Sequence, residues 1–125
     1  MRNSLEDAQL CAEAADNKKA FDIIVLDLRG LTYITDYFVI CSGSNTTQVS
    51  AISDWIGQTL AKTGVYPSHI EGQAESSWVL MDYGDVVVHI FDEQTRAYYA
   101  LEKLWGDAAR VPFISRPKAL QSATP

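Results

Sequence analysis

Two β-rich runs, residues 78–82 and 86–91, flank the segment Tyr83-Gly84-Asp85. A short glycine-containing link between two such runs predicts a β-hairpin. Side chains alternate between the two faces of a strand, so the same residues share a face whichever two residues form the turn. One face is uniformly apolar and is predicted to be core: Val79, Met81, Val86, Val88 and Ile90. The other face is mixed and fits either a partner surface or a site: Trp78, Leu80, Asp82, Val87, His89 and Phe91.

The whole chain of 125 residues fits one domain. The expected elements are a helix over 5–18 with Ser4 as N-cap, strands over 22–27 and 37–42, a helix from Asn45 to residue 63, an edge strand over 67–70, the hairpin and a last helix over 92–105. Asn45 and Gln48 have the capping-box spacing, and Gly64 suits a helix end. The order α-β-β-α-β-β-β-α predicts an α/β (α+β) fold with one mixed sheet of about five strands and flanking helices.

The last predicted helix carries an apolar stripe that should meet the sheet: Ala97, Tyr98, Leu101, Leu104 and Trp105. Arg96, Tyr99 and Lys103 would then point elsewhere. After Gly106 the chain becomes rich in proline and basic residues. We therefore expect a single domain over residues 1–108 and a flexible tail over residues 109–125.

Charge is distributed unevenly along the chain. The net charge is −6, and between residues 21 and 94 the only basic residues are Arg29 and Lys62, against ten acids. An acidic body repels a phosphate backbone, so direct nucleic-acid binding by the body is disfavoured. The same charge attracts basic proteins, although it also suits plain solubility.

The sequence gives no sign of a membrane or secretory protein. No apolar run approaches the roughly 20 residues that span a bilayer, and the first residues carry acids in place of a signal's apolar segment. We therefore expect a cytoplasmic protein with reduced cysteines. Cys11 and Cys41 lack a Cys-x-x-Cys spacing, which favours small apolar packing over metal or redox roles.

Several hairpin residues admit more than one interpretation. His89 could be a half-buried histidine bonded to a neighbour or a docking residue, whereas a metal or catalytic role would need convergence with Asp82, His69 or Glu71. Trp78 could equally be a core-edge residue or an interface anchor. Tyr83 stands at the hairpin tip, where we expect it to be exposed and available for contact.

An enzyme alternative rests on Gly43-Ser44, which lies between a strand and a helix and resembles the phosphate cradle of nucleotidyltransferases. Those enzymes also need two carboxylates on one strand face for magnesium. The acids that could serve flank a turn or are adjacent: Asp82 and Asp85, and Asp92 and Glu93. We therefore predict no catalytic residues, no metal site and no cofactor.

A set of motifs carries a family resemblance: Thr35-Asp36, Glu71-Gly72, Trp78, residues 82–85, His89, Arg96 with Tyr99, and residues 101–105. Together they resemble the Iojap family of ribosomal silencing factors over residues 21–107. The resemblance implies a nucleotidyltransferase-like fold without its chemistry. It also implies docking on the large ribosomal subunit through its protein number fourteen, a block to joining of the small subunit, and repression of translation when nutrients fall.

Family members often form dimers, so the mixed hairpin face could serve a homodimer instead. The partner-binding residues that we expect come from the hairpin and the last helix: Trp78, Asp82, Tyr83, Asp85, His89, Arg96, Tyr99 and Lys103.

Overall fold

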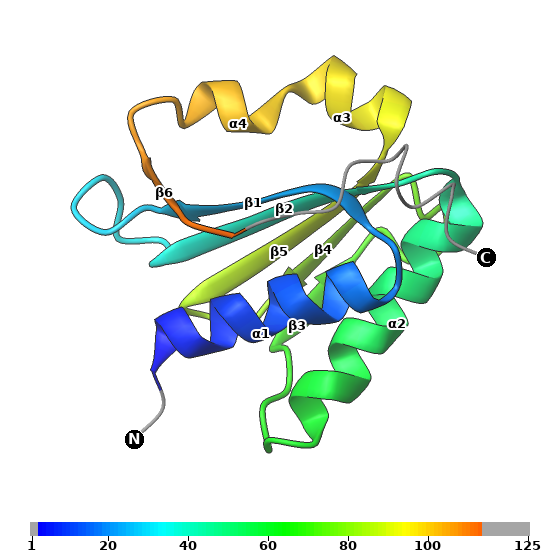
Figure 1. Ribbon diagram of the computed structural model, residues 1–125, viewed down its shortest axis with the longest axis horizontal. Coiled ribbons are helices and arrows are strands. Elements are labelled where there is room, and N and C mark those ends of the chain that lie inside the picture. Colours follow the sequence, from blue (N-terminus) through cyan, green and yellow to red (C-terminus); the bar gives the residue numbers. More distant parts are fainter. Residues whose placement is uncertain (1–2, 114–125) are drawn as a thin grey trace.

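The computed structural model describes residues 3–113 and shows one mixed sheet with helices on both faces (Figure 1). The sheet has six strands in the order β3-β4-β5-β2-β1-β6. The elements are α1 (Ser4–Asn17), β1 (Phe21–Asp27), β2 (Tyr37–Gly43), α2 (Thr46–Ala61), β3 (His69–Glu71), β4 (Trp78–Asp82), β5 (Val86–Asp92), α3 (Glu93–Tyr99), α4 (Leu101–Leu104) and β6 (Ala109–Val111). Helices α1 and α2 cover one face, the α1–α2 face, and α3 and α4 lie over the other, the α3–α4 face.

The central strands β2 and β5 are parallel, and every other pair in the sheet is antiparallel. In the β4–β5 hairpin Leu80 pairs with His89, so Gly84 and Asp85 form the turn. Gly84 has a φ of 87°, a backbone conformation that glycine adopts at little cost. The predicted division of the hairpin into an apolar core face and a mixed face is confirmed.

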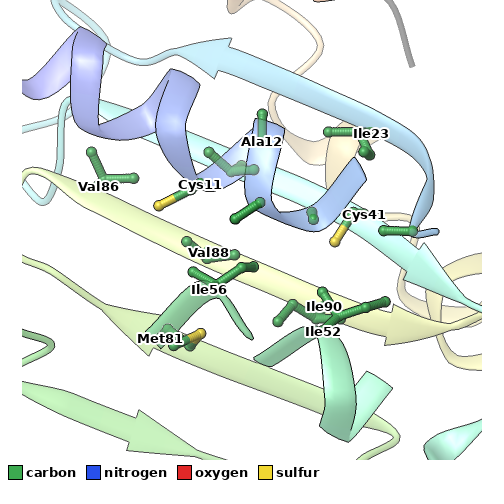
Figure 2. Packing of buried hydrophobic residues seen from close by; sticks show 14 of the residues in the cluster. Cys11, Ala12, Ile23, Cys41, Ile52, Ile56, Met81, Val86, Val88 and Ile90 are labelled. Carbon is green, nitrogen blue, oxygen red and sulfur yellow. The ribbon is translucent and has the colours of Figure 1, made fainter. Parts of the chain in front are cut away.

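The α1–α2 face holds the larger core. Figure 2 shows Cys11 of α1 and Cys41 of β2 packed among aliphatic side chains such as Ile56 of α2 and Val88 of β5. Burial raises the pKa of both thiols, that of Cys41 to about 12. Both cysteines therefore act as small apolar packing residues, as the sequence predicts.

Capping explains where the two long helices begin. Asn3, and not Ser4, caps α1, because its side chain accepts hydrogen bonds from the backbone N–H groups of Leu5 and Glu6. Ser4 is the first helical residue and bonds Asp36 instead. At α2, Asn45 accepts from the backbone of Gln48 at 2.8 Å, as expected.

The end of the chain differs from the expectation in two ways. A single helix over 92–105 is wrong: Ala100 has a φ of 45° and a ψ of 49°, which breaks the helix into α3 and α4. The left-handed residue that ends a helix is usually glycine. The alanine at position 100 therefore did not indicate a helix end in the sequence. The sheet also continues past the predicted boundary at residue 108, because β6 pairs with β1 and adds a sixth strand. The rest of the predicted tail, residues 114–125, lies outside the described residues.

Candidate docking surface

Aromatic side chains gather on the α3–α4 face. The Trp78 ring lies 4.9 Å from the Phe91 ring and 4.8 Å from the Tyr99 ring, measured between centroids. Further along the face, Phe38 meets the ring of Trp105 at 5.7 Å in an edge-to-face arrangement. Such ring pairs contribute about 0.5–1.5 kcal/mol beyond their buried area. Aromatic rings therefore contribute to the packing of α3 and α4 on the sheet, beside aliphatic side chains such as Leu101.

His89 lies inside this cluster and is only 4% exposed. The Trp78 indole N–H donates to its Nδ1 at 3.1 Å, so the neutral imidazole carries its proton on Nε2. Burial lowers the pKa of His89 to about 4, which keeps the ring neutral. In the described part of the chain Nε2 has no hydrogen-bond acceptor, and the Phe38 ring lies edge-to-face with the imidazole at 4.5 Å.

The expectation that His89 touches a partner directly is therefore not met, because its side chain has almost no accessible surface. Its observed role is to hold the Trp78 indole, which corresponds to the bonded-neighbour interpretation. Trp78 itself is half-buried: it packs in the cluster and still lines the surface.

Trp78 forms one wall of a surface hollow between α3 and the loop over residues 72–77. The lining residues are Glu75, Ser77, Trp78, Gln94, Thr95, Tyr98 and Tyr99. Tyr98 is 81% exposed and Tyr99 49% exposed. Exposure of Tyr98 contradicts the predicted apolar stripe, and Leu104 of that stripe is 76% exposed as well. The break at Ala100 separates Tyr98 on α3 from Leu101 and Trp105, which pack against the sheet.

Acidic groups border the same face of the sheet. In the pairing of β3 with β4, His69 lies opposite Asp82 and Glu71 opposite Leu80, which places these four residues on the α3–α4 face. Glu71 and Asp85 are exposed, and Asp82 is half-buried. Asp82 accepts a hydrogen bond from the Gly84 N–H, and His69 contacts the Glu71 carboxylate at 2.8 Å. Within residues 3–113, no group of three histidine, cysteine or carboxylate side chains could hold a metal ion.

Tyr83 does not project from the hairpin tip. It is half-buried, packs against the core of the α1–α2 face, and has a fully enclosed hydroxyl. Burial raises its pKa well above the usual value for tyrosine. Strand alternation continues one residue beyond Asp82 and turns Tyr83 to the same face as Met81. The expectation of an exposed contact residue is therefore wrong.

Arg96 also lies inward, contrary to the expectation that it points away from the sheet. Its Nη1 donates to the Asp22 carbonyl at 2.6 Å and to the Ser42 hydroxyl at 2.9 Å, and its Nε contacts Glu102 at 3.2 Å. These bonds tie α3 and α4 to the ends of β1 and β2. Lys103 is exposed, as expected.

Sequence reasoning missed two exposed features. Glu75 was assigned only to a polar loop, yet it lines the hollow. In the connection from β1 to β2, Tyr33 and Ile34 are exposed apolar residues, together with Leu31. A run of apolar residues after Gly30, outside any periodic element, was the available signal for the second feature.

Packing accounts for the glycine of the Gly43-Ser44 segment, which the enzyme alternative takes as part of a phosphate cradle. A Cβ on Gly43 would lie 3.0 Å from Cγ2 of Val49, so close packing against α2 explains the glycine. The hollow beside Ser44 is lined by Asp92 and Glu93, whose charges oppose a phosphate.

Taken together, the fold and the surface define a class: a small mixed-sheet α/β domain whose half-covered face presents aromatic and acidic groups. None of the described helices is long and apolar enough to cross a membrane. The family model described as "Ribosomal silencing factor during starvation" matches residues 1–124. The chain belongs to this ribosomal silencing factor family.

Individual relatives support the same family assignment. The Bacillus subtilis protein named "Ribosomal silencing factor RsfS" is 47% identical over 100 residues, which cover 80% of this chain and 85% of the relative. The maize protein named "Protein Iojap, chloroplastic" is 41% identical over 101 residues, 80% of this chain and 43% of the relative. A crystal structure from Chromobacterium violaceum has a TM-score of 0.82 at 34% identity and covers 94% of this chain and 97% of its own. The resemblance stated from sequence motifs is thereby confirmed, and so is the mixed α/β fold.

Proposed function

We propose that this protein docks on the large ribosomal subunit through a basic ribosomal protein, its protein number fourteen, and thereby blocks joining of the small subunit. On this proposal it represses translation under nutrient limitation, acts in the cytoplasm and has no enzymatic activity. Membership of the silencing factor family supports a role in ribosome-associated regulation of translation.

The observation that carries the docking proposal is the half-covered α3–α4 face. On β4 the residues of the α1–α2 face, Val79 and Met81, are buried, whereas Trp78, Leu80 and Asp82 remain partly accessible. A surface with apolar groups beside carboxylates suits a basic protein partner. Apolar contact contributes binding affinity, and opposite charge orients the partner and raises the association rate.

The structure leads us to redistribute the predicted contact residues. Trp78, Asp82, Asp85, Tyr99 and Lys103 are proposed to touch the partner, since each has accessible surface. His89 supports this surface by holding Trp78, and Arg96 supports it by holding α3. Tyr83 packs against the core and is no longer proposed as a contact residue.

The test uses purified large subunits and sedimentation, followed by an assay of subunit joining. We expect the protein to sediment with large subunits and to lower the fraction of joined ribosomes. The paired variant Asp82→Asn with Asp85→Asn removes two charges from the docking face, while the side-chain amide introduced at position 82 can still accept the turn hydrogen bond. Its matched control is Glu13→Gln with Asp54→Asn, two exposed acids on α1 and α2.

Loss of binding in the first pair alone supports the proposal. Equal binding by both pairs and wild type removes the α3–α4 face as the docking surface. Failure of the wild type to sediment with large subunits overturns the proposed function. If the face forms a homodimer instead, the wild type should show twice the mass of one chain in solution, and the Asp82→Asn, Asp85→Asn variant should show a smaller fraction of dimer.

A further inference from the structure

The hollow between α3 and the loop over residues 72–77 combines aromatic walls with one carboxylate. Tyr98 and Tyr99 stand at 89° to each other with ring centroids 5.0 Å apart, and Trp78 lies 4.8 Å from Tyr99. The two tyrosines therefore form a corner, and both rings are substantially exposed. Contiguous exposed apolar groups rimmed by polar residues are typical of an interaction site.

The charge in the hollow has one sign. Glu75 is the only ionisable carboxylate among its lining residues, and no lysine or arginine lines it within the described part of the chain. The remaining lining groups, Ser77, Gln94 and Thr95, are neutral and polar. A cation that enters this space would contact aromatic faces and a carboxylate, and it would not compete with a lysine or arginine among the lining residues.

The loop that carries Glu75 is held in a defined shape. Gly72 has a φ of 87°, and a Cβ there would collide with the Trp78 carbonyl oxygen, so only glycine fits. The Ser76 N–H donates to the Gly72 carbonyl at 2.8 Å, and the Asp92 N–H donates to the Ser77 carbonyl at 3.0 Å. Glu75 thus belongs to a loop that is bonded to itself and to the end of β5, and it lines the hollow together with the two tyrosines.

We propose that this hollow, formed by Trp78, Tyr98, Tyr99 and Glu75, is a cage for a single arginine side chain of the basic partner. A planar guanidinium stacks on aromatic rings and pairs with a carboxylate at the same time, which a compact ammonium does less well. This inference rests on the proposed function, because a basic ribosomal protein is the source of the arginine.

A direct test uses Nα-acetyl-arginine amide as the probe and its neutral counterpart Nα-acetyl-citrulline amide as the control ligand. Binding to the full chain is followed by NMR at the backbone amides of Glu75, Ser77 and Thr95. We expect saturable shifts with the arginine compound and none with the citrulline compound. Equal shifts with both compounds, or shifts spread over other acidic surfaces, overturn the cage.

Two variants locate the effect. Glu75→Gln removes the carboxylate and Tyr98→Ala removes an exposed ring, and each should weaken binding of the arginine probe about five- to tenfold. The matched controls are Glu13→Gln on α1 and Tyr66→Ala, whose side chains are exposed elsewhere. If the controls weaken binding as much as the hollow variants do, general charge or aromatic content explains the result and the inference fails.

The same four variants are then sedimented with large ribosomal subunits. We expect Glu75→Gln and Tyr98→Ala to bind the subunits about five- to tenfold more weakly than wild type, with both controls unchanged. If wild type and all variants bind subunits equally, the cage fails while the proposed function stands. If the arginine probe binds the hollow but wild type does not bind subunits, the cage is supported and the large-subunit proposal is overturned.

Discussion

The two faces of the sheet are built from the same strands and differ in how they are covered. Helices α1 and α2, of fourteen and sixteen residues, bury the α1–α2 face under aliphatic side chains. On the opposite face α3 and α4 have seven and four residues, and they leave rings and carboxylates partly accessible. Alternate residues of one strand therefore serve different purposes: those on the first face hold the fold together, and those on the second are available for a partner.

Side-chain size accounts for part of the contrast. The buried positions of α1 are small residues, namely Ala8, Cys11, Ala12, Ala14 and Ala15. Small residues let a helix approach a sheet closely and leave few gaps. On the other face, bulky rings take part in the contacts with the short helices, and a hollow lies beside Trp78.

The largest expected effect is on stability at the α1–α2 face. Ile56→Ala removes a fully buried side chain that packs on β5 and β4, and should lower the free energy of unfolding by about 2–5 kcal/mol. Chemical denaturation followed by circular dichroism measures the change. Binding of large subunits per folded molecule should be unaffected, and a selective loss of binding would break the proposed division between the faces.

The second effect concerns His89, whose folded-state pKa is about 4. Unfolded histidine has a pKa of about 6.5, so between pH 6.5 and pH 4 the unfolded state binds a proton that the folded state does not. The stability that the neutral, buried ring contributes is full above pH 6.5 and is lost as the pH falls toward 4, by about 3 kcal/mol in total.

His89→Gln removes this titration. The difference in unfolding free energy between wild type and variant, measured at several pH values, should therefore shrink as the pH falls over this range. A difference that does not change with pH would mean that His89 is not buried as a neutral ring.

A smaller gain is expected from Ala100→Gly, at the break between α3 and α4. Alanine in the left-handed conformation is strained, and glycine relieves this strain while adding some freedom to the unfolded chain. We expect a net increase in unfolding free energy of about 0.5–1 kcal/mol, measured by denaturant titration. A decrease in stability would show that α3 and α4 form one continuous helix in solution.

The smallest stability effect belongs to Tyr98→Ala on the α3–α4 face. Since the side chain is mostly exposed, the free energy of unfolding should change by no more than about 0.5 kcal/mol. Thermal denaturation beside the Ile56→Ala variant gives the contrast directly. A cost comparable to that of Ile56→Ala would mean that Tyr98 belongs to the core after all.

Patterns within one element were readable from the sequence. The alternation of the hairpin, the Asn45 cap and the apolar face of α2 each depend on neighbours a few residues away, and the structure has all three. The family resemblance depended on a combination of motifs, among them Gly72, whose close approach to Trp78 gives that glycine a physical reason.

What escaped prediction depends on contacts between distant segments. Arg96 reaches the Asp22 carbonyl at a position where β1 changes register, and β6 finds its place only because β1 offers a free edge. The left-handed Ala100 has no local signal. Tyr83 was different, because extending the strand alternation by one residue past Asp82 would have turned it toward the core.

The parallel pairing of β2 with β5 has a consequence for how quickly the chain reaches this structure. Hairpins β1–β2 and β4–β5 join segments that are close in sequence, so each closes a short loop. The central pair joins Tyr37 to Val86 and can form only after the intervening chain, including α2, has been brought together. Docking of two preformed hairpins along β2 and β5 is therefore the expected slow event in refolding.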